Sequence, residues 1–118
     1  MPAIRLATWN INSVRLRADL VRRLLKDHAP DVLCLQETKV ADELFPRAVF
    51  NELGYVHQAI NGQKGYHGVA ILSRLPFRKT EALAFCGKDD TRYVSAVFEA
   101  GLELHNFYVP AGGDIPDP

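Results

Sequence analysis

The segment Pro-Asp-Val-Leu-Cys-Leu-Gln at residues 30–36 constrains the fold more than any other part of this chain. The four residues before Gln36 are all apolar, so a strand at residues 31–36 would have two apolar faces. Such a strand must be covered on both sides, which is typical of a sheet inside an α/β protein. The sequence therefore predicts an α/β fold in which this strand lies between covering layers.

Two further elements are predicted before this strand. Residues 4–9 form a short apolar run that suits a buried strand, and the polar segment at residues 10–13 ends it as a loop or helix cap. Residues 14–28 then show helical periodicity, which Pro30 interrupts. Because hydrophobic residues recur at helical spacing, this helix is expected to pack through one apolar face. That face consists of Leu16, Leu20, Val21, Leu24 and Leu25.

Beyond residue 36 the periodicity changes from helical to extended. Residues 42–53 predict a weak helix, which begins near its middle because of Pro46 and ends at Gly54. The β-branched and aromatic residues that follow predict successive antiparallel strands. These strands are expected at residues 55–60, 68–73, 92–99 and 102–109.

The last of these strands mixes polar and apolar side chains on one face. The residues of this face alternate with those of the opposite face, so we expect the face to line a site. It consists of Leu102, Leu104, Asn106 and Tyr108. After it, residues 111–118 form a loop, and a sheet of these strands would leave one apolar face uncovered. Both features predict a truncated domain whose remaining layers lie in sequence beyond this chain.

Composition and charge set few limits on the partners of this protein. With 118 residues, 47% hydrophobic and 24% charged, the chain is typical of a small globular domain. Fourteen basic and fourteen acidic residues cancel, so any binding of nucleic acid must come from local charge. Cys34 and Cys86 have neither metal-ligand spacing nor a disulfide framework, which favours a reduced, cytoplasmic protein. Since the chain has no signal-like or membrane-spanning apolar stretch, we expect neither export nor anchoring.

Polar residues that directly follow buried runs are the first candidates for chemistry. Asn10 follows the first predicted strand, and Glu37 follows the second. At such positions a rigid sheet can aim a side chain into a cleft. A capping amide for Asn10 and a solvated carboxylate for Glu37 are equally open interpretations at this point. If a hard cation such as Mg²⁺ binds, Glu37 is its best ligand, because Mg²⁺ prefers carboxylate oxygens and keeps several waters.

Four sequence blocks resemble the exodeoxyribonuclease III and AP endonuclease family in order and spacing. They are Thr-Trp-Asn-Ile-Asn-Ser-Val-Arg at 8–15, Pro-Asp-Val-Leu-Cys-Leu-Gln-Glu-Thr-Lys at 30–39, Gly-Gln-Lys-Gly-Tyr-His-Gly-Val-Ala-Ile at 62–71 and Phe-Tyr-Val-Pro-Ala-Gly-Gly at 107–113. Any one block alone would be a weak signal, whereas four at consistent intervals along the whole chain are specific. The resemblance implies a single domain of which residues 1–118 are the N-terminal part. It also implies half of a four-layer αββα sandwich, with mostly antiparallel sheets and flanking helices.

The resemblance implies a catalytic and metal site built from strand ends. Glu37 occupies the position of the metal-ligating glutamate, and Asn10 that of an asparagine that organises the metal and the catalytic carboxylate. The expected ion is Mg²⁺, with Mn²⁺ as its substitute. Tyr108 matches a tyrosine that contacts the scissile phosphate or supports the nucleophile, although an amphipathic ring at a strand end is the plain alternative. Asn12 is a weaker candidate for an indirect role at the metal.

A second group of residues lies in blocks that face DNA in similar proteins. Contacts there would be with the backbone rather than with bases. For two of these residues, Lys39 and Lys64, a solvated charge is an equally good interpretation. The whole group consists of Lys39, Gln63, Lys64, Tyr66, His67 and Arg92.

The implied activity is that of a DNA-repair nuclease on double-stranded DNA. The complete protein, expected to be a monomer, would cleave 5′ to abasic sites and remove nucleotides from 3′ ends. The family's later blocks, which supply a catalytic aspartate and histidine, are absent from this sequence, so these residues alone are expected to be inactive. Two alternatives remain, namely a phosphatase or phosphodiesterase acting on lipid phosphates, and a non-catalytic half domain that self-associates through its exposed sheet.

Overall fold

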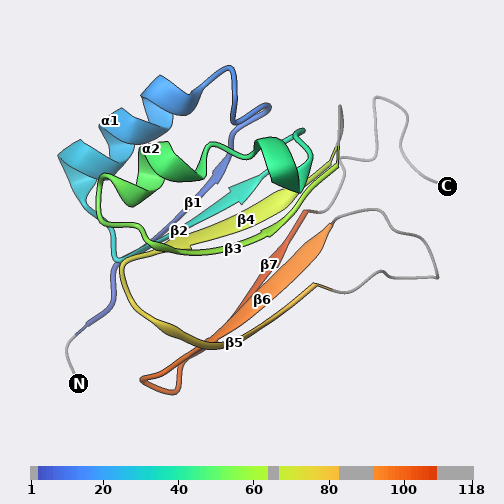
Figure 1. Cartoon of the computed structure of the whole chain (residues 1–118). Helices are drawn as coiled ribbons and strands as arrows, with labels where there is room; N and C mark the ends of the chain where they lie inside the picture. The colour runs from blue at the N-terminus through green and yellow to red at the C-terminus, as the bar shows by residue number, and fades with distance from the viewer. Residues whose placement is uncertain (1–2, 64–66, 83–91, 109–118) are drawn as a thin grey trace, which may run out of the picture.

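The computed structural model describes residues 3–63, 67–82 and 92–108, and in these residues the strands form two sheets. Two α-helices lie over one face of the first sheet, and the second sheet packs against its other face (Figure 1). A separate apolar core fills each of the two interfaces. The predicted α/β class, with mostly antiparallel sheets and flanking helices, is confirmed.

The first sheet has four strands in the order β1-β2-β4-β3. β1 and β2 run parallel, whereas β4 is antiparallel to both of its neighbours. All four strands were predicted, with ends that differ by no more than two residues. The burial expected for the first of them is wrong, because β1 lies at the edge of the sheet and its residues are exposed or half-buried. Their bounds are Leu6–Asn10 for β1, Val32–Gln36 for β2, His57–Asn61 for β3 and Val69–Ser73 for β4.

β2 is apolar on both faces because it separates the two cores. Leu33 and Leu35 are fully buried in the core shared with the helices. Val32 and Cys34 belong to the core shared with the second sheet. Burial raises the pKa of the Cys34 thiol to about 11, so this thiol stays protonated at neutral pH. The predicted strand with covering layers on both sides is confirmed.

The first helix, α1, spans Ala18–His28 and begins four residues after the predicted start at residue 14. Ser13 has a φ of 86°, which is incompatible with a right-handed helix. The backbone N–H of Val14 donates to the carbonyl oxygen of Thr38 at 3.0 Å. This bond ties the predicted first turn to the loop after β2, so the helix forms only beyond it.

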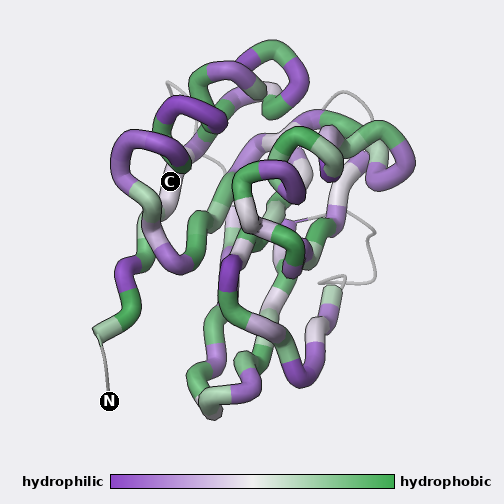
Figure 2. The backbone as a smooth tube through the Cα atoms, turned by 60° about the vertical axis from the view of Figure 1, so that its left-hand side comes forward, coloured by the Kyte–Doolittle hydropathy of each residue, from purple (hydrophilic) through white to green (hydrophobic). Residues whose placement is uncertain are grey.

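The predicted apolar face of this helix is only partly correct. Hydrophobic and hydrophilic residues alternate along α1 (Figure 2). Val21 and Leu25 are buried, and Leu24 is half-buried against the same core. Leu16 lies before the helix and is 81% exposed, and Leu20 is also exposed. The later start of the helix therefore removes Leu16 from the face to which the periodicity assigned it.

The second predicted helix divides at Pro46, as the sequence indicated. A short 3₁₀ turn, η1, spans Asp42–Leu44, and the helix α2 spans Arg47–Asn51. Proline fixes its own φ and lacks an N–H, so it is tolerated before the first turn of a helix but not within one. Gly54 follows with a φ of 95°, a left-handed conformation that ends the helical segment.

The second sheet contains three strands in the order β5-β6-β7, all antiparallel. β5 was not predicted. Its sequence is mainly polar and exposed because it is an edge strand, so no hydrophobic alternation reveals it. The bounds are Phe77–Glu81 for β5, Tyr93–Phe98 for β6 and Glu103–Phe107 for β7.

The expectation of a single sheet is wrong within the part of the chain that the structure describes, because the strands form two sheets. An exposed apolar ring does remain on the outer face of the second sheet, where Phe107 is 49% exposed. The connection from β4 to β5 crosses to the second sheet, and the apolar faces of the two sheets then cover each other. The outer face of the second sheet carries Glu103 and His105, whose side chains hydrogen-bond at 3.0 Å. Residue 109, the predicted end of the last strand, lies outside the described residues, as does the loop at residues 111–118.

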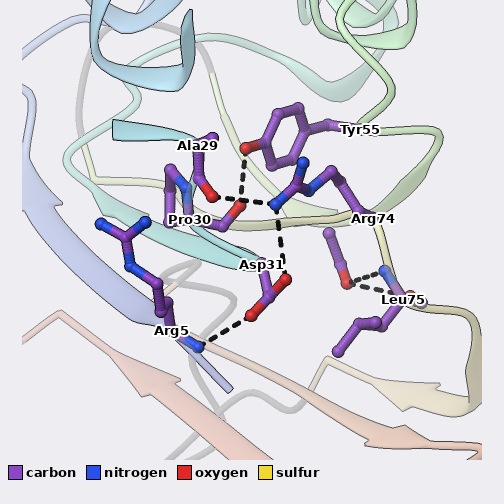
Figure 3. A network of polar contacts seen from close by, with 8 residues as sticks. Arg5, Ala29, Pro30, Asp31, Tyr55, Arg74 and Leu75 are labelled. Carbon is purple, nitrogen blue, oxygen red and sulfur yellow. Dashed lines mark hydrogen bonds and ion pairs between the residues drawn. The ribbon is translucent and has the colours of Figure 1, made fainter. Parts of the chain in front are cut away.

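A network of hydrogen bonds and an ion pair joins the chain segments around the amino end of β2 (Figure 3). The guanidinium of Arg74 donates to the carbonyl oxygen of Ala29 at 2.8 Å and lies 3.4 Å from the Asp31 carboxylate. That carboxylate also accepts from the backbone N–H of Arg5 at 2.8 Å. The network joins the segments before β1 and β2 to the end of β4, at the opposite end of β2 from Glu37.

Replacing Tyr55 by phenylalanine is expected to lower the free energy of unfolding by about 1–2 kcal/mol. Tyr55 is 1% exposed, and its hydroxyl donates to the carbonyl oxygen of Pro30 at 2.6 Å. The variant leaves this buried carbonyl without its donor while keeping the packing of the ring. Urea denaturation measures the effect as a lower midpoint with an unchanged slope. A midpoint equal to that of the wild type would show that the bond contributes nothing.

Candidate active site

Pairing of β1 with β2 brings the two candidates for metal binding to one edge of the first sheet. Because the strands are parallel, their carboxyl ends lie together, and Asn10 is paired with Gln36. Glu37 is therefore the next residue after the partner of Asn10. The side chain of Glu37 is 23% exposed, and that of Asn10 lies at the exposed end of its strand. The predicted proximity of these two positions is thus explained by register alone.

The loops around Glu37 hold an unusual concentration of left-handed backbone. Six non-glycine residues with positive φ occur in the described segments, and five of them lie in the loops at this edge. Each such conformation costs roughly 1–3 kcal/mol, and these costs tend to gather at functional sites. The five residues are Asn12, Ser13, Glu37, Lys39 and His67.

Backbone hydrogen bonds join these loops into one rigid unit. The N–H of Ser13 donates to the carbonyl oxygen of Glu37 at 2.8 Å, and the N–H of Lys39 donates to that of His67 at 2.8 Å. Thr38 is 1% exposed and donates its N–H to the carbonyl oxygen of Gly68 at 3.1 Å. A Cβ atom on Gly68 would lie 2.1 Å from the Thr38 hydroxyl oxygen, so only glycine fits there. This close approach fixes the loop that carries Glu37.

Tyr108 is brought from the second sheet to the side of Glu37. Burial raises the pKa of the Tyr108 phenol, and the negative charge of Glu37 and a hydrogen bond to its carboxylate raise it further. The positive charge of Arg92 acts in the opposite direction, and the carbonyl oxygen of Arg92 accepts from the N–H of Tyr108 at 2.8 Å. The ring of His67 lies 5.6 Å from that of Tyr108, centroid to centroid. The phenol therefore stays protonated and donates to Glu37.

Lys39 also lies close to Glu37. Its ammonium nitrogen lies 3.9 Å from a carboxylate oxygen of Glu37 and 2.5 Å from the side-chain oxygen of Asn12. Arg17 donates to the carbonyl oxygen of Asn12, which holds this residue in place. Lys39 is therefore a neighbour of the carboxylate in this structure, although its predicted contact with DNA stays a prediction.

The remaining predicted DNA contacts are placed only in part. His67 and Arg92 both lie next to Tyr108, at the same edge as Glu37. Gln63 is half-buried and follows the end of β3 by two residues. Lys64 and Tyr66 lie outside the described residues.

Two amides at this edge were not named as catalytic or binding residues, although the face of the last strand that carries one of them, Asn106, was predicted to line a site. A cavity of about 420 Å³ opens between β1 and β7, the edge strands of the two sheets, and Asn10 and Tyr108 both line it. Gln36 and Asn106 line it as well, and Asn106 is only 3% exposed. An amide in the otherwise apolar inner face of the last strand was the available signal for Asn106, whereas Gln36 had none.

The donor set fits a hard divalent cation that takes few protein ligands. One partly buried carboxylate, on Glu37, and one amide oxygen, on Asn10, are available at neighbouring strand ends. No group of three or more His, Cys, Asp or Glu residues is arranged for metal binding within the described ranges. Mg²⁺ keeps several waters and borrows phosphate oxygens from its substrate, so a sparse oxygen set suits it.

The sequence matches the endonuclease/exonuclease/phosphatase family over residues 7–117, and the chain belongs to this family. It is 42% identical over 71 residues to exodeoxyribonuclease III of Haemophilus influenzae. This alignment covers 60% of the chain and 26% of the Haemophilus protein. No described helix is long and apolar enough to cross a membrane.

Solved structures show the same fold. An AP endonuclease from Archaeoglobus fulgidus is 41% identical, with a TM-score of 0.84, over 92% of this chain and 42% of that chain. A 3′ phosphatase from Neisseria, solved with a product DNA hairpin, is 35% identical, with a TM-score of 0.83, over 90% of this chain and 41% of that chain. The chain thus spans less than half the length of the relatives it matches.

Proposed function

We propose that this chain supplies part of the active site of a Mg²⁺-dependent DNA-repair nuclease. The observation that carries the proposal is the contact between Tyr108 and Glu37, because it joins the two sheets where Asn10 also ends its strand. A carboxylate, a phenol and an amide at one strained, rigid edge are suited to phosphodiester hydrolysis. The similarity to an exodeoxyribonuclease III and to an AP endonuclease supports this choice of reaction.

Each residue has a distinct role in the proposed chemistry. Glu37 and Asn10 would hold the ion, which when bound withdraws charge from a phosphate oxygen and acidifies water. Tyr108 keeps its proton at neutral pH, so its hydroxyl can donate to a phosphate oxygen as charge develops there. Arg92 lies close enough to influence the Tyr108 phenol and adds positive charge beside the same phosphate. Lys39 balances the charge of Glu37 when the site holds no substrate.

The proposed substrate is double-stranded DNA with an abasic site or a free 3′ end. The net charge of the chain is zero, so attraction to DNA must arise from residues near the site rather than from the whole surface. His67, Arg92 and Lys39 are the described candidates at this edge. Contacts with the DNA backbone from these residues would position the duplex without reading its sequence. Cleavage 5′ to the abasic site and removal of 3′ nucleotides are the two expected reactions.

A chimera can test the proposal directly. Residues 1–118 would be fused to the part of the Archaeoglobus fulgidus AP endonuclease that this chain does not cover. We expect the chimera to nick an abasic duplex in Mg²⁺ and to lose this activity in chelator, whereas residues 1–118 alone should not nick it. Nicking by residues 1–118 alone would contradict the expected division of the catalytic groups, and a folded but inactive chimera would contradict the nuclease site.

The same chimera separates the alternative reactions. Hydrolysis of a phosphoinositide or sphingomyelin without cleavage of DNA would favour the lipid-directed branch of this fold. A concentration-dependent dimer of residues 1–118 in sedimentation, without catalysis by the chimera, would favour a self-associating half domain. A monomeric, DNA-cleaving chimera is the result that the proposal predicts.

A further inference from the structure

Asn106 is the polar exception on the inner face of the second sheet. Its neighbours on this face, Val94, Ala96 and Leu104, pack into the apolar core between the sheets. Asn106 is 3% exposed, and a buried amide without partners would be strongly unfavourable. An apolar side chain could fill this position without needing hydrogen-bond partners. The presence of an amide here therefore needs an explanation.

The amide of Asn106 crosses from one sheet to the other. Its Nδ2 group donates to the carbonyl oxygens of Leu35 and Ala70, at 3.0 and 2.8 Å, in the two central strands of the first sheet. Its Oδ1 atom accepts from the side-chain amide of Gln36 at 2.8 Å. All three bonds lead from β7 to the first sheet, so they fix the distance and the register between the two sheets.

Gln36 extends this network to the remaining strand of the site. Its Nε2 group also donates to the hydroxyl oxygen of Thr8 on β1 at 3.0 Å. The network therefore joins β1, β2, β4 and β7. Each polar member stands one or two residues before a candidate site residue, since Thr8 precedes Asn10, Gln36 precedes Glu37 and Asn106 precedes Tyr108.

We propose that Asn106 is a positioning residue that holds Tyr108 against Glu37 by locking β7 onto β2 and β4. The catalytic meaning of this role rests on the proposed function, whereas the positioning itself does not. Tyr108 is the second residue after Asn106, so a shift of β7 along or away from the first sheet moves the phenol with it. The two central strands of the first sheet, β2 and β4, would not move with β7, because they are held between two cores. A buried amide whose oxygen and nitrogen are both hydrogen-bonded, as in Asn106, specifies one arrangement where apolar packing would allow several.

The closing experiment compares three variants of the 118-residue chain. Asn106→Leu keeps the approximate volume and removes all three bonds, and Asn106→Ser keeps a single short donor. Tyr55→Phe is the matched control, because it removes a buried hydrogen bond at the opposite end of the sandwich. Nuclear Overhauser contacts between the rings of His67 and Tyr108, which lie 5.6 Å apart by centroid, report the position of Tyr108. Denaturation midpoints report stability in parallel.

We expect the contact between the two rings to weaken in the serine variant and to disappear in the leucine variant. In Tyr55→Phe it should keep its full strength even though the midpoint falls. Wild-type ring contacts in a folded Asn106→Leu variant would overturn the proposal. If that variant does not fold, the serine variant decides, and a contact of wild-type strength there would overturn it equally.

Activity of the chimera supplies an independent readout. Asn106→Leu should lower kcat by about 10- to 100-fold and leave KM within about twofold, since Tyr108 acts at the reacting phosphate. Tyr55→Phe should change neither constant. An equal loss of kcat in Asn106→Leu and Tyr55→Phe would mean that Asn106 affects activity only through the stability of the fold. Should the chimera be inactive, the nuclease proposal fails, while the ring contacts still decide whether Asn106 positions Tyr108.

Discussion

Replacing Glu37 by glutamine in the chimera is expected to lower the rate of abasic-site nicking by about 100- to 1,000-fold. Glutamine keeps the size of the side chain but removes the charge of the carboxylate that lies beside Tyr108 and directly after the partner of Asn10. The backbone should tolerate the change, because the left-handed φ of 56° is equally available to both residues. The measurement is the nicking rate at saturating Mg²⁺.

Glu81→Gln is the matched control for this variant. Glu81 lies on the exposed edge strand β5, where its carboxylate pairs with Lys79 at 2.8 Å. An exposed pair of this kind contributes little to stability, and it lies outside the proposed site, so nicking should stay within about twofold of the wild type. Similar losses of nicking rate in Glu37→Gln and Glu81→Gln would show a general effect of charge. An undiminished nicking rate in Glu37→Gln would show that Glu37 is not part of the active site.

Replacing Gly68 by alanine is expected to lower the free energy of unfolding by about 2–5 kcal/mol. Two costs add at this position. The φ of 96° is unfavourable for any residue with a Cβ atom, and the new Cβ would lie 2.1 Å from the hydroxyl oxygen of Thr38 and 3.2 Å from the backbone nitrogen of Lys39. Relief of this overlap must displace the loop that carries Glu37. Chemical denaturation measures the loss of stability, and nicking by the chimera should fall with it.

Gly101→Ala separates the two costs. Gly101 has nearly the same φ, 99°, but a Cβ atom there would meet nothing within 4 Å. This control should therefore lose only about 1–2 kcal/mol, which is the cost of the left-handed conformation alone. If both alanine variants lose the same free energy, the close approach of Gly68 to Thr38 has no energetic importance, and the loop is less tightly fixed than its geometry indicates.

The elements that the sequence predicted best are those with a local cause. The apolar run of β2 requires cover on both sides, and Pro46 cannot lie within a helix, so both features were readable without the fold. The start of α1 was misplaced because the hydrogen bond from Val14 to Thr38 joins residues 24 positions apart. β5 was missed because its polar residues form a strand only through pairing with β6.

The same distinction explains which parts of the site were predictable. Glu37 follows the buried run of β2, whereas Asn10 ends β1, a strand whose residues are exposed or half-buried. Family resemblance added Tyr108 to these two positions. Their proximity depends on the parallel register of β1 with β2 and on the packing of the second sheet, neither of which has a local signal. The amides of Gln36 and Asn106 bond across 70 positions of sequence, so only the folded structure reveals that they belong together.

Paramagnetic Mn²⁺ added to the isotope-labelled 118-residue chain tests the central claim, that Glu37 and Asn10 bind a divalent ion. At low occupancy the ion broadens the NMR signals of nuclei close to it, and no catalysis is required. We predict selective broadening at Asn10, Glu37 and Tyr108, its loss in Glu37→Gln, and unbroadened signals around Asp31 at the opposite end of β2. Broadening centred on Asp31 or on Glu103, or broadening at Asn10 that persists in Glu37→Gln, would contradict the account.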